Sequence, residues 1–351
     1  MPDSITTKDL RTLELSVEKA TRYIVANQIK NGGIPWFADN KLDPWDHTEA
    51  LMALIISNQT NAWHKGFKWL AENQNSDGSW FANYYSSEEM SSTYIETNFV
   101  AYPATGLWHY YLCTQDASTL KYFYPTIEKA INYILRHQHK EGDIQWAVAD
   151  HNNSHTESPP KDALVTACSS ILRSLECAIS IAETLSQPCD SWRQSYLSLY
   201  GTLKNKPWRF DRTWESKERF SMDWFYPILA GIYGKSEAQL RLDQRWNIFV
   251  EPEIGCRCVS DEPWVTVAES CELCLALIAS GRKKEAAKIL ISLTRWQDKD
   301  GGFWTGYNFR DNNIWPQEKT TWTAAAFIIA SDALLELSQG SHLFTQPSSI
   351  I

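Results

Sequence analysis

The stretch Gln74-Asn-Ser-Asp-Gly78-Ser-Trp80 decides the fold, because its order of Gln, Gly and Trp occurs four times along the chain. At the end of a helix, Gln can bond unpaired backbone groups, Gly permits a positive φ, and Trp covers the turn with a large apolar face. Such a turn, repeated, predicts an array of paired helices. The other copies are Gln28-Gly32-Trp36, Gln138-Gly142-Trp146 and Gln297-Gly301-Trp304.

Apolar residues recur with a helical period on both sides of these turns. First members of the pairs carry charge on one face (KATRYIVANQ, 19–28), whereas second members are apolar nearly all round (AAAFIIASDALL, 324–335). Six apolar helices ringed by six amphipathic ones predict an all-α (α/α)6 toroid without strands. We expect one domain, 1–351, with its core at 13–338. The predicted pairs are 13–28 with 47–57, 62–74 with 96–113, 118–138 with 162–185, 191–203 with 223–233, 237–249 with 267–280, and 283–297 with 321–338.

Two prolines fall inside predicted helices, and each is expected to disturb its helix. Pro103 should kink the second inner helix, and Pro125 should break the third outer helix into two pieces. The polar segment 148–160, with His151 and His155, predicts a long solvated loop, with a lid or a metal-binding patch as alternatives.

Composition excludes several classes of protein. The chain has 351 residues, 43% of them hydrophobic, and a net charge of −9, which argues against nucleic acid as a partner. The first residues, MPDSITTKDL, lack the apolar core of a signal peptide, and no apolar run is long enough to span a membrane. We therefore expect a cytoplasmic protein without stable membrane insertion that acts on a small molecule. A homo-oligomer is compatible with this composition.

Eight cysteines are too few for a disulfide-stapled module of this length. Cys256 and Cys258 form a CxC pair, and Cys271 and Cys274 form a CxxC pair, so a zinc site is one interpretation. The second pair lies in an amphipathic helix, which favours core packing instead. We assign no metal, and whether these four cysteines bind one stays open.

Polar residues gather where the inner helices begin, and these starts are expected to share one rim. Each carboxylate taken singly is explained by helix capping, but so many carboxylates and indoles at one opening indicate a ligand site. The candidate catalytic residues are Asp46, His47, Glu49, Glu96, Asp223, Glu269 and Glu318. The candidate substrate-binding residues are Trp45, Asn98, Tyr102, Trp224, Tyr226, Trp264, Trp315, Trp322, Arg219 and Arg257.

Two enzymatic chemistries fit this set of side chains. Aromatic faces stabilise a carbocation, which a carboxylic acid kept protonated by burial can generate from an alkene. Alternatively, indoles stack on sugar rings while Asp46 or Glu49 faces Glu269 or Glu318 as acid and base of a glycosidase. A binding module without catalysis is the third interpretation. Arg219 and Arg257 would meet an anionic substrate, or would balance the acidic rim.

The phrases QNSDGSW and QDKDGGFW resemble the QW repeats of squalene-hopene and oxidosqualene cyclases, and the inner helices resemble the toroid that these cyclases share with protein prenyltransferase β subunits. The resemblance implies a single-barrel terpenoid cyclase or isoprenoid-processing enzyme with an isoprenoid substrate. It needs no cofactor, except Mg²⁺ if the substrate is a diphosphate. Residues 43–49 resemble the acid motif of class II cyclases, in which Trp45 replaces the proton donor and Asp46, beside His47, is the nearest substitute.

Overall fold

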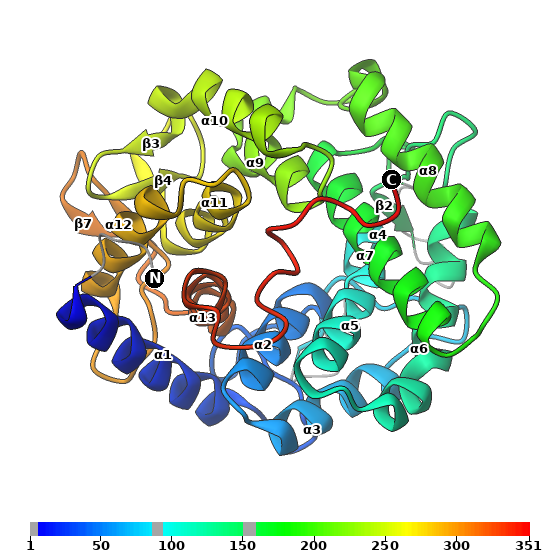
Figure 1. Ribbon diagram of the computed structural model, residues 1–351, viewed down its shortest axis with the longest axis horizontal. Coiled ribbons are helices and arrows are strands. Elements are labelled where there is room, and N and C mark those ends of the chain that lie inside the picture. Colours follow the sequence, from blue (N-terminus) through cyan, green and yellow to red (C-terminus); the bar gives the residue numbers. More distant parts are fainter. Residues whose placement is uncertain (1–5, 86–93, 150–158) are drawn as a thin grey trace.

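The inner ring consists of helices that run side by side around a common axis. A computed structural model describes residues 6–85, 94–149 and 159–351 (Figure 1). Within these residues each inner helix contacts the next, and α13 contacts both α11 and α2, so the ring closes. The inner helices are α2 (Pro44–Ile56), α4 (Thr97–Ala101) with α5 (Pro103–Thr114), α7 (Val165–Thr184), α9 (Ser221–Leu229), α11 (Val267–Ala279) and α13 (Thr321–Leu335).

The outer helices alternate with the inner ones along the chain and surround them, which confirms the predicted (α/α)6 toroid. Their exposed faces carry the charged residues, whereas α2 and α13 are buried over nearly their whole length. The outer helices are α1 (Thr7–Asn27), α3 (Thr60–Glu72), α6 (Ala117–Arg136), α8 (Asp190–Asn205), α10 (Lys235–Phe249) and α12 (Lys283–Leu293).

The repeated motif joins neighbouring outer helices. In the second copy, the Gln74 amide donates to the carbonyl of Gly78 at 3.0 Å and to the carbonyl of Thr126 on α6 at 2.9 Å. Gly78 has a φ of +97° and lies so close to α6 that a Cβ there would meet the Lys129 carbonyl oxygen at 2.4 Å. The same bonds recur in the other three copies, from Gln28 to α3, from Gln138 to α8, and from Gln297 to α1. The motif is therefore a clamp, and its last copy ties α12 to α1.

Replacing Gln74 by alanine is expected to destabilise the protein by about 2 kcal/mol, because two backbone carbonyls lose their donor. Urea unfolding followed by circular dichroism measures this change. Gln187→Ala is the matched control, because Gln187 is exposed and its side-chain amide makes a single long hydrogen bond of 3.4 Å. Equal midpoints for the two variants would contradict the clamp.

Two features differ from the sequence-based expectation. Helix α6 is continuous through Pro125, so the predicted break is wrong, whereas Pro103 does separate α4 from α5. Short strands lie between the helices although none was predicted, because strands of two or three residues leave no alternating pattern. They are β1 (Tyr94–Glu96) paired with β2 (Ala147–Ala149), and a sheet of β3 (Val250–Glu251), β4 (Gly255–Arg257), β5 (Trp264–Thr266), β6 (Gly306–Asn308) and β7 (Asn313–Ile314), all antiparallel.

Helix α7 is long and apolar enough to cross a membrane by composition, but most of it is buried inside the ring. Its apolar surface packs against α5, α8 and α9. Most of the predicted polar loop at 148–160, with His151 and His155, lies outside the described residues.

Candidate active site

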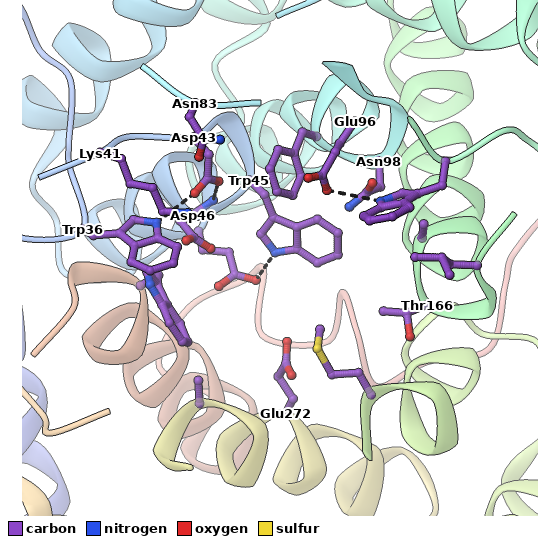
Figure 2. A pocket seen from close by; sticks show the side chains of 18 of the residues that line it. Trp36, Lys41, Asp43, Trp45, Asp46, Asn83, Glu96, Asn98, Thr166 and Glu272 are labelled. Carbon is purple, nitrogen blue, oxygen red and sulfur yellow. Dashed lines mark hydrogen bonds between the residues drawn. The ribbon is translucent and has the colours of Figure 1, made fainter. Parts of the chain in front are cut away.

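A cavity of about 320 Å³ opens at the rim where the inner helices begin (Figure 2). Every inner segment contributes to its wall, and the preceding loops supply the rest. The lining residues are Trp36, Lys41, Asp43, Trp45, Asp46, Glu49, Asn83, Tyr94, Glu96, Asn98, Phe99, Trp146, Leu164, Thr166, Ala167, Met222, Ala268, Glu269, Glu272 and Trp322.

Helix α2 and its N-cap residue present three carboxyl groups to the cavity, those of Asp43, Asp46 and Glu49, each one turn from the next. Asp43 caps the helix by accepting from the backbone N–H of Asp46 at 2.9 Å, and its second oxygen accepts from the Trp36 indole at 2.8 Å. Burial, together with the charges of Asp43 and Glu49, raises the pKa of Asp46 well above its usual range. Burial therefore favours the protonated form of Asp46.

Glu49 lies one turn deeper on α2. Its Oε1 accepts from the Trp45 indole at 2.9 Å and from the Tyr102 hydroxyl at 3.1 Å. These two bonds favour the carboxylate, but burial outweighs them and raises the pKa of Glu49 to about 7.

Helix α11 repeats this arrangement on another side of the cavity. Glu269 is the third residue of α11, as Asp46 is the third residue of α2, and Glu272 follows one turn deeper, as Glu49 does. Figure 2 shows Glu272 pointing into the space that Asp46 also faces. The Oε2 of Glu269 is buried and has no hydrogen-bond partner among the described residues. Burial, and then the neighbouring glutamates, raises the pKa of Glu272 well above its usual range.

A further acidic side chain of the cavity, Glu96, lies at the junction of β1 and α4. Burial raises the pKa of Glu96 to about 7, and its Oε2 accepts from the Trp146 indole at 3.2 Å. The neighbouring Asn98 is 5% exposed, and its Oδ1 has no partner within the described ranges. An unpaired acceptor on a cavity wall is suited to a hydroxyl group of a ligand.

Aromatic rings form the remaining walls. Trp36 and Trp322 meet edge to face with 5.8 Å between ring centroids, and the Lys41 ammonium lies 3.8 Å from the Trp36 centroid. The Nε1 of Trp322 is buried without a partner in the described part of the chain. Trp45 stacks on Tyr102 at 4.7 Å, so its ring is fixed by packing as well as by its bond to Glu49.

Beneath this cavity lies a second one of about 20 Å³, which we call the floor cavity. Glu49 and Glu272 border both cavities. Tyr102 and Tyr226, predicted to bind substrate, border only the floor cavity. The other residues that line it are Leu229, Leu275, Ala326, Ile329 and Phe344.

Three predicted catalytic residues lie outside both cavities. His47 is fully buried, accepts from the Ile34 backbone N–H at 3.1 Å, and contacts the Gly66 carbonyl at 3.0 Å. Burial lowers the pKa of His47 to about 4, which favours its neutral form, and both ring nitrogens contact backbone groups outside the cavity. Asp223 is buried and its pKa is raised to about 7, while Glu318 is only partly buried.

Five predicted binding residues serve other contacts. The Trp224 indole donates to the Arg241 carbonyl, and the Trp264 indole donates to the carbonyl of Trp315, which is 53% exposed. Arg219 pairs with Asp261, and Arg257 pairs with Glu251. These guanidinium groups are therefore neutralised locally, away from the cavity.

Several residues that line the cavity were not among the sequence-based candidates, although two features of the sequence indicated them. Glu272 follows Glu269 by three residues, a spacing that places both carboxyl groups on one helix face. Trp36 and Trp146 belong to the repeated motif and were interpreted only as turn covers. Trp80 does keep that role, since it is fully buried and donates to the Leu70 carbonyl.

Most of the cysteines pack in the core, whereas Cys113, Cys189 and Cys258 are only partly buried. Cys256, Cys271 and Cys274 are fully buried, and all eight thiols are free. In the part of the chain that the structure describes, no three His, Cys, Asp or Glu residues are placed to hold a metal ion.

An (α/α)6 toroid with a cavity of paired carboxyl groups and indoles defines the class of this protein as an enzyme. No family model matches the chain. The chain is 37% identical over 322 residues to the MMP endo-(1,4)-3-O-methyl-alpha-D-mannosidase of Mycolicibacterium hassiacum, and the match covers 90% of this chain and 85% of that protein. The chain belongs to the family of this mannosidase.

Solved structures show the same fold at low sequence identity. A wild-type glycosidase has a TM-score of 0.71 at 12% identity and covers 95% of this chain and 100% of its own. A D-mannose isomerase has a TM-score of 0.68 at 13% identity, covering 95% and 99%. An alpha-amylase from Clostridium perfringens has a TM-score of 0.65 at 12% identity, covering 90% and 97%.

These relatives correct the sequence-based assignment. The predicted terpenoid cyclase or prenyltransferase relationship is wrong, and so is the isoprenoid substrate, because the matching enzyme is a mannosidase. The repeated Gln-Gly-Trp motif caused the error, since it builds the clamps of the outer ring and does not distinguish one reaction from another, although its Trp36 and Trp146 also line the cavity. The glycosidase alternative is the one that the mannosidase relative supports.

Proposed function

We propose that this protein is a glycoside hydrolase that cleaves internal α-(1,4) bonds in a mannan whose residues carry 3-O-methyl groups. The observation that carries the proposal is the matched placement of Asp46 and Glu269, each the third residue of an inner helix and each lining the same cavity. The name of the relative from Mycolicibacterium hassiacum supplies the substrate. Most glycoside hydrolases use two carboxyl groups, placed on the walls of a cavity that holds the sugar, as their catalytic residues.

Asp46 acts as the general acid in this proposal. Burial beside Asp43 and Glu49 raises its pKa and so favours the protonated form, which can give its proton to the glycosidic oxygen as the bond breaks. Asp43 holds the helix start through its bond to the Asp46 backbone, and its own bond to Trp36 fixes its orientation.

Glu269 is the second carboxyl group. Glu269 lines the same cavity and its buried Oε2 has no hydrogen-bond partner among the described residues, so in this proposal the carboxyl group takes a proton from an entering water molecule or approaches the sugar ring. Trp36, Trp146 and Trp322 offer apolar faces for sugar rings, and the apolar side chains of Leu164 and Met222 suit a methyl ether.

The test is hydrolysis of an α-(1,4)-linked 3-O-methylmannose oligosaccharide, followed by the appearance of new reducing ends. We expect internal cleavage by the wild type and a loss of about 1,000-fold in kcat for Glu269→Gln. Glu262→Gln, the same change at an exposed position, should keep full activity. Two results would contradict the proposal. One is a wild type that releases no reducing ends from any α-mannoside, and the other is a fully active Glu269→Gln variant.

Replacing Trp322 by phenylalanine is expected to raise KM about tenfold, because only the indole N–H that would reach a sugar oxygen is lost. Michaelis–Menten kinetics on the same oligosaccharide measure this change. Trp63→Phe is the control, since Trp63 also has an unpaired buried Nε1 but lies outside the cavity. An unchanged KM for Trp322→Phe would show that this N–H does not contact the substrate.

A further inference from the structure

The chain does not end beside α13 but crosses the middle of the ring. Residues 340–351, which we call the C-terminal segment, run from the end of α13 over the centre of the inner helices to α7 and α8 (Figure 1, red). The segment has no helix or strand, so its path is set by side-chain and backbone contacts with the ring.

Buried polar groups of the ring hold this segment. The Arg173 guanidinium donates to the Gln346 carbonyl at 3.0 Å and to Glu176 at 2.7 Å. Glu176 Oε1 accepts from the Ser349 backbone N–H at 2.7 Å, and the Tyr196 hydroxyl donates to Ser348 Oγ at 2.6 Å. Arg173 and Glu176 are only 5% and 6% exposed. A buried ion pair is costly unless its remaining polar atoms are bonded, and the segment supplies those bonds.

Phe344 is the one residue by which the segment reaches the floor cavity, among the residues that the structure describes. There it lies with Glu49 and Glu272, which also line the cavity above. The floor cavity, at about 20 Å³, has room for about one water molecule. The pair of carboxyl groups of Glu49 and Glu272 is therefore shielded from bulk solvent on this side.

We propose that the C-terminal segment is part of the active site, and that Phe344 is a positioning residue that seals the floor beneath Glu49 and Glu272 against water. The inference rests on the proposed function, because the sealed pair lies one helical turn below Asp46 and Glu269. Sealing keeps the local dielectric low, which strengthens the bonds from Trp45 and Tyr102 that fix Glu49.

Neutral and acidic groups surround this pair, and no cation faces it among the residues that line the two cavities except Lys41 at the rim. Helix α13 faces the pair with Ala326 and Ile329, and α9 faces it with Leu229 and Tyr226. Burial is therefore the main reason that the pKa of Glu49 is raised to about 7. The titratable groups that interact electrostatically with Glu49 or Glu272 are Asp43, Asp46, Tyr102, Tyr226, Cys256, Cys258, Glu269 and Cys271.

The test follows the titration of Glu49 by NMR of protein labelled with 13C at the glutamate carboxyl groups, with Glu49→Gln assigning the signal. Phe344→Leu, Phe344→Val and Phe344→Ala open the floor progressively, and Phe344→Ala should lower the midpoint by about one pH unit as water enters. Leu343→Ala is the matched control, since Leu343 is also half-buried in the segment but does not line the floor cavity. An unmoved midpoint in the smallest variant that folds, or an equal shift in Leu343→Ala, would overturn the proposal.

Kinetics give the second readout. Phe344→Ala should lower kcat about tenfold with KM nearly unchanged, because the floor lies below the sugar-binding walls. A shifted midpoint with full kcat would show that the seal has no part in turnover and would overturn the assignment of Phe344 as a positioning residue. The titration needs no substrate, so its outcome is separate from that of the hydrolysis assay with the wild type.

Discussion

Asp46→Asn is expected to lower kcat/KM for a methylated mannan oligosaccharide about 1,000-fold, because the amide has no proton to give to the leaving oxygen. The fold should be unaffected, since an asparagine amide can still donate to Asp43 from the same position. An aryl oligomannoside with an activated leaving group needs little protonation. On this substrate the variant should recover most of its rate, which steady-state kinetics on both substrates will measure.

Asp223→Asn is the matched control for this variant. Asp223 is also the third residue of an inner helix and is also a buried carboxyl group with a raised pKa, but it does not line the cavity. It should therefore keep full activity. If Asp46→Asn loses the same factor on both substrates, Asp46 is not the acid. If Asp223→Asn loses as much as Asp46→Asn, the change reports on helix α9 and not on proton transfer.

The toroid was predictable because its determinants are local. A positive φ at Gly78 and the helical period of apolar residues are both visible in short stretches, and the structure has the six expected pairs within its described residues. The kink at Pro103 follows from the missing N–H of proline. At Pro125 the same rule failed: α6 continues through the proline and packs against α4, α5, α7 and α8.

The direction of side chains around each inner helix was less predictable. Asp46 faces the cavity, but His47, one residue further, is turned by about 100° and faces Gly66 on α3. Trp224 likewise faces Arg241 on α10. Which side of an inner helix faces the axis of the toroid depends on how that helix is rotated about its own axis in the packed ring. A single sequence does not show this rotation.

The wrong prediction of the reaction also has a physical cause. Carboxyl groups and indoles at a common opening serve both carbocations and sugars, and the motif that suggested the cyclases belongs to the outer clamps. What favours the sugar is the relationship to the mannosidase, and two paired sets of carboxyl groups, Asp46 with Glu269 and Glu49 with Glu272 on two helices, fit that reaction. This correspondence becomes visible only when the first residues of α2 and α11 are known. The sequence-based prediction started α2 three residues too late.

The melting temperature should fall as pH rises from 5 to 8. Burial raises the pKa of Glu49, Glu96 and Asp223 to about 7, so the folded protein binds these protons more tightly than the unfolded chain does. Their stabilisation is complete below the unfolded pKa values and is lost as pH rises through about 7. His47 and His109, with pKa values lowered to about 4, act in the opposite direction between about 4 and 6.5. The carboxyl groups outnumber the histidines, and we expect a net fall of about 5 °C in calorimetry.

Glu49→Gln isolates one part of this effect. The amide oxygen can accept the same two bonds from Trp45 and Tyr102, but it never has to ionise in a buried site. The variant should therefore melt about 3 °C higher than the wild type at pH 8 and at the same temperature at pH 5, where Glu49 is protonated. Glu262→Gln, exposed and outside the cavity, should follow the wild type at both values. A Glu49→Gln variant that gains nothing at pH 8 would mean that water reaches Glu49, and that the carboxyl pair beneath Asp46 and Glu269 is solvated and not sealed.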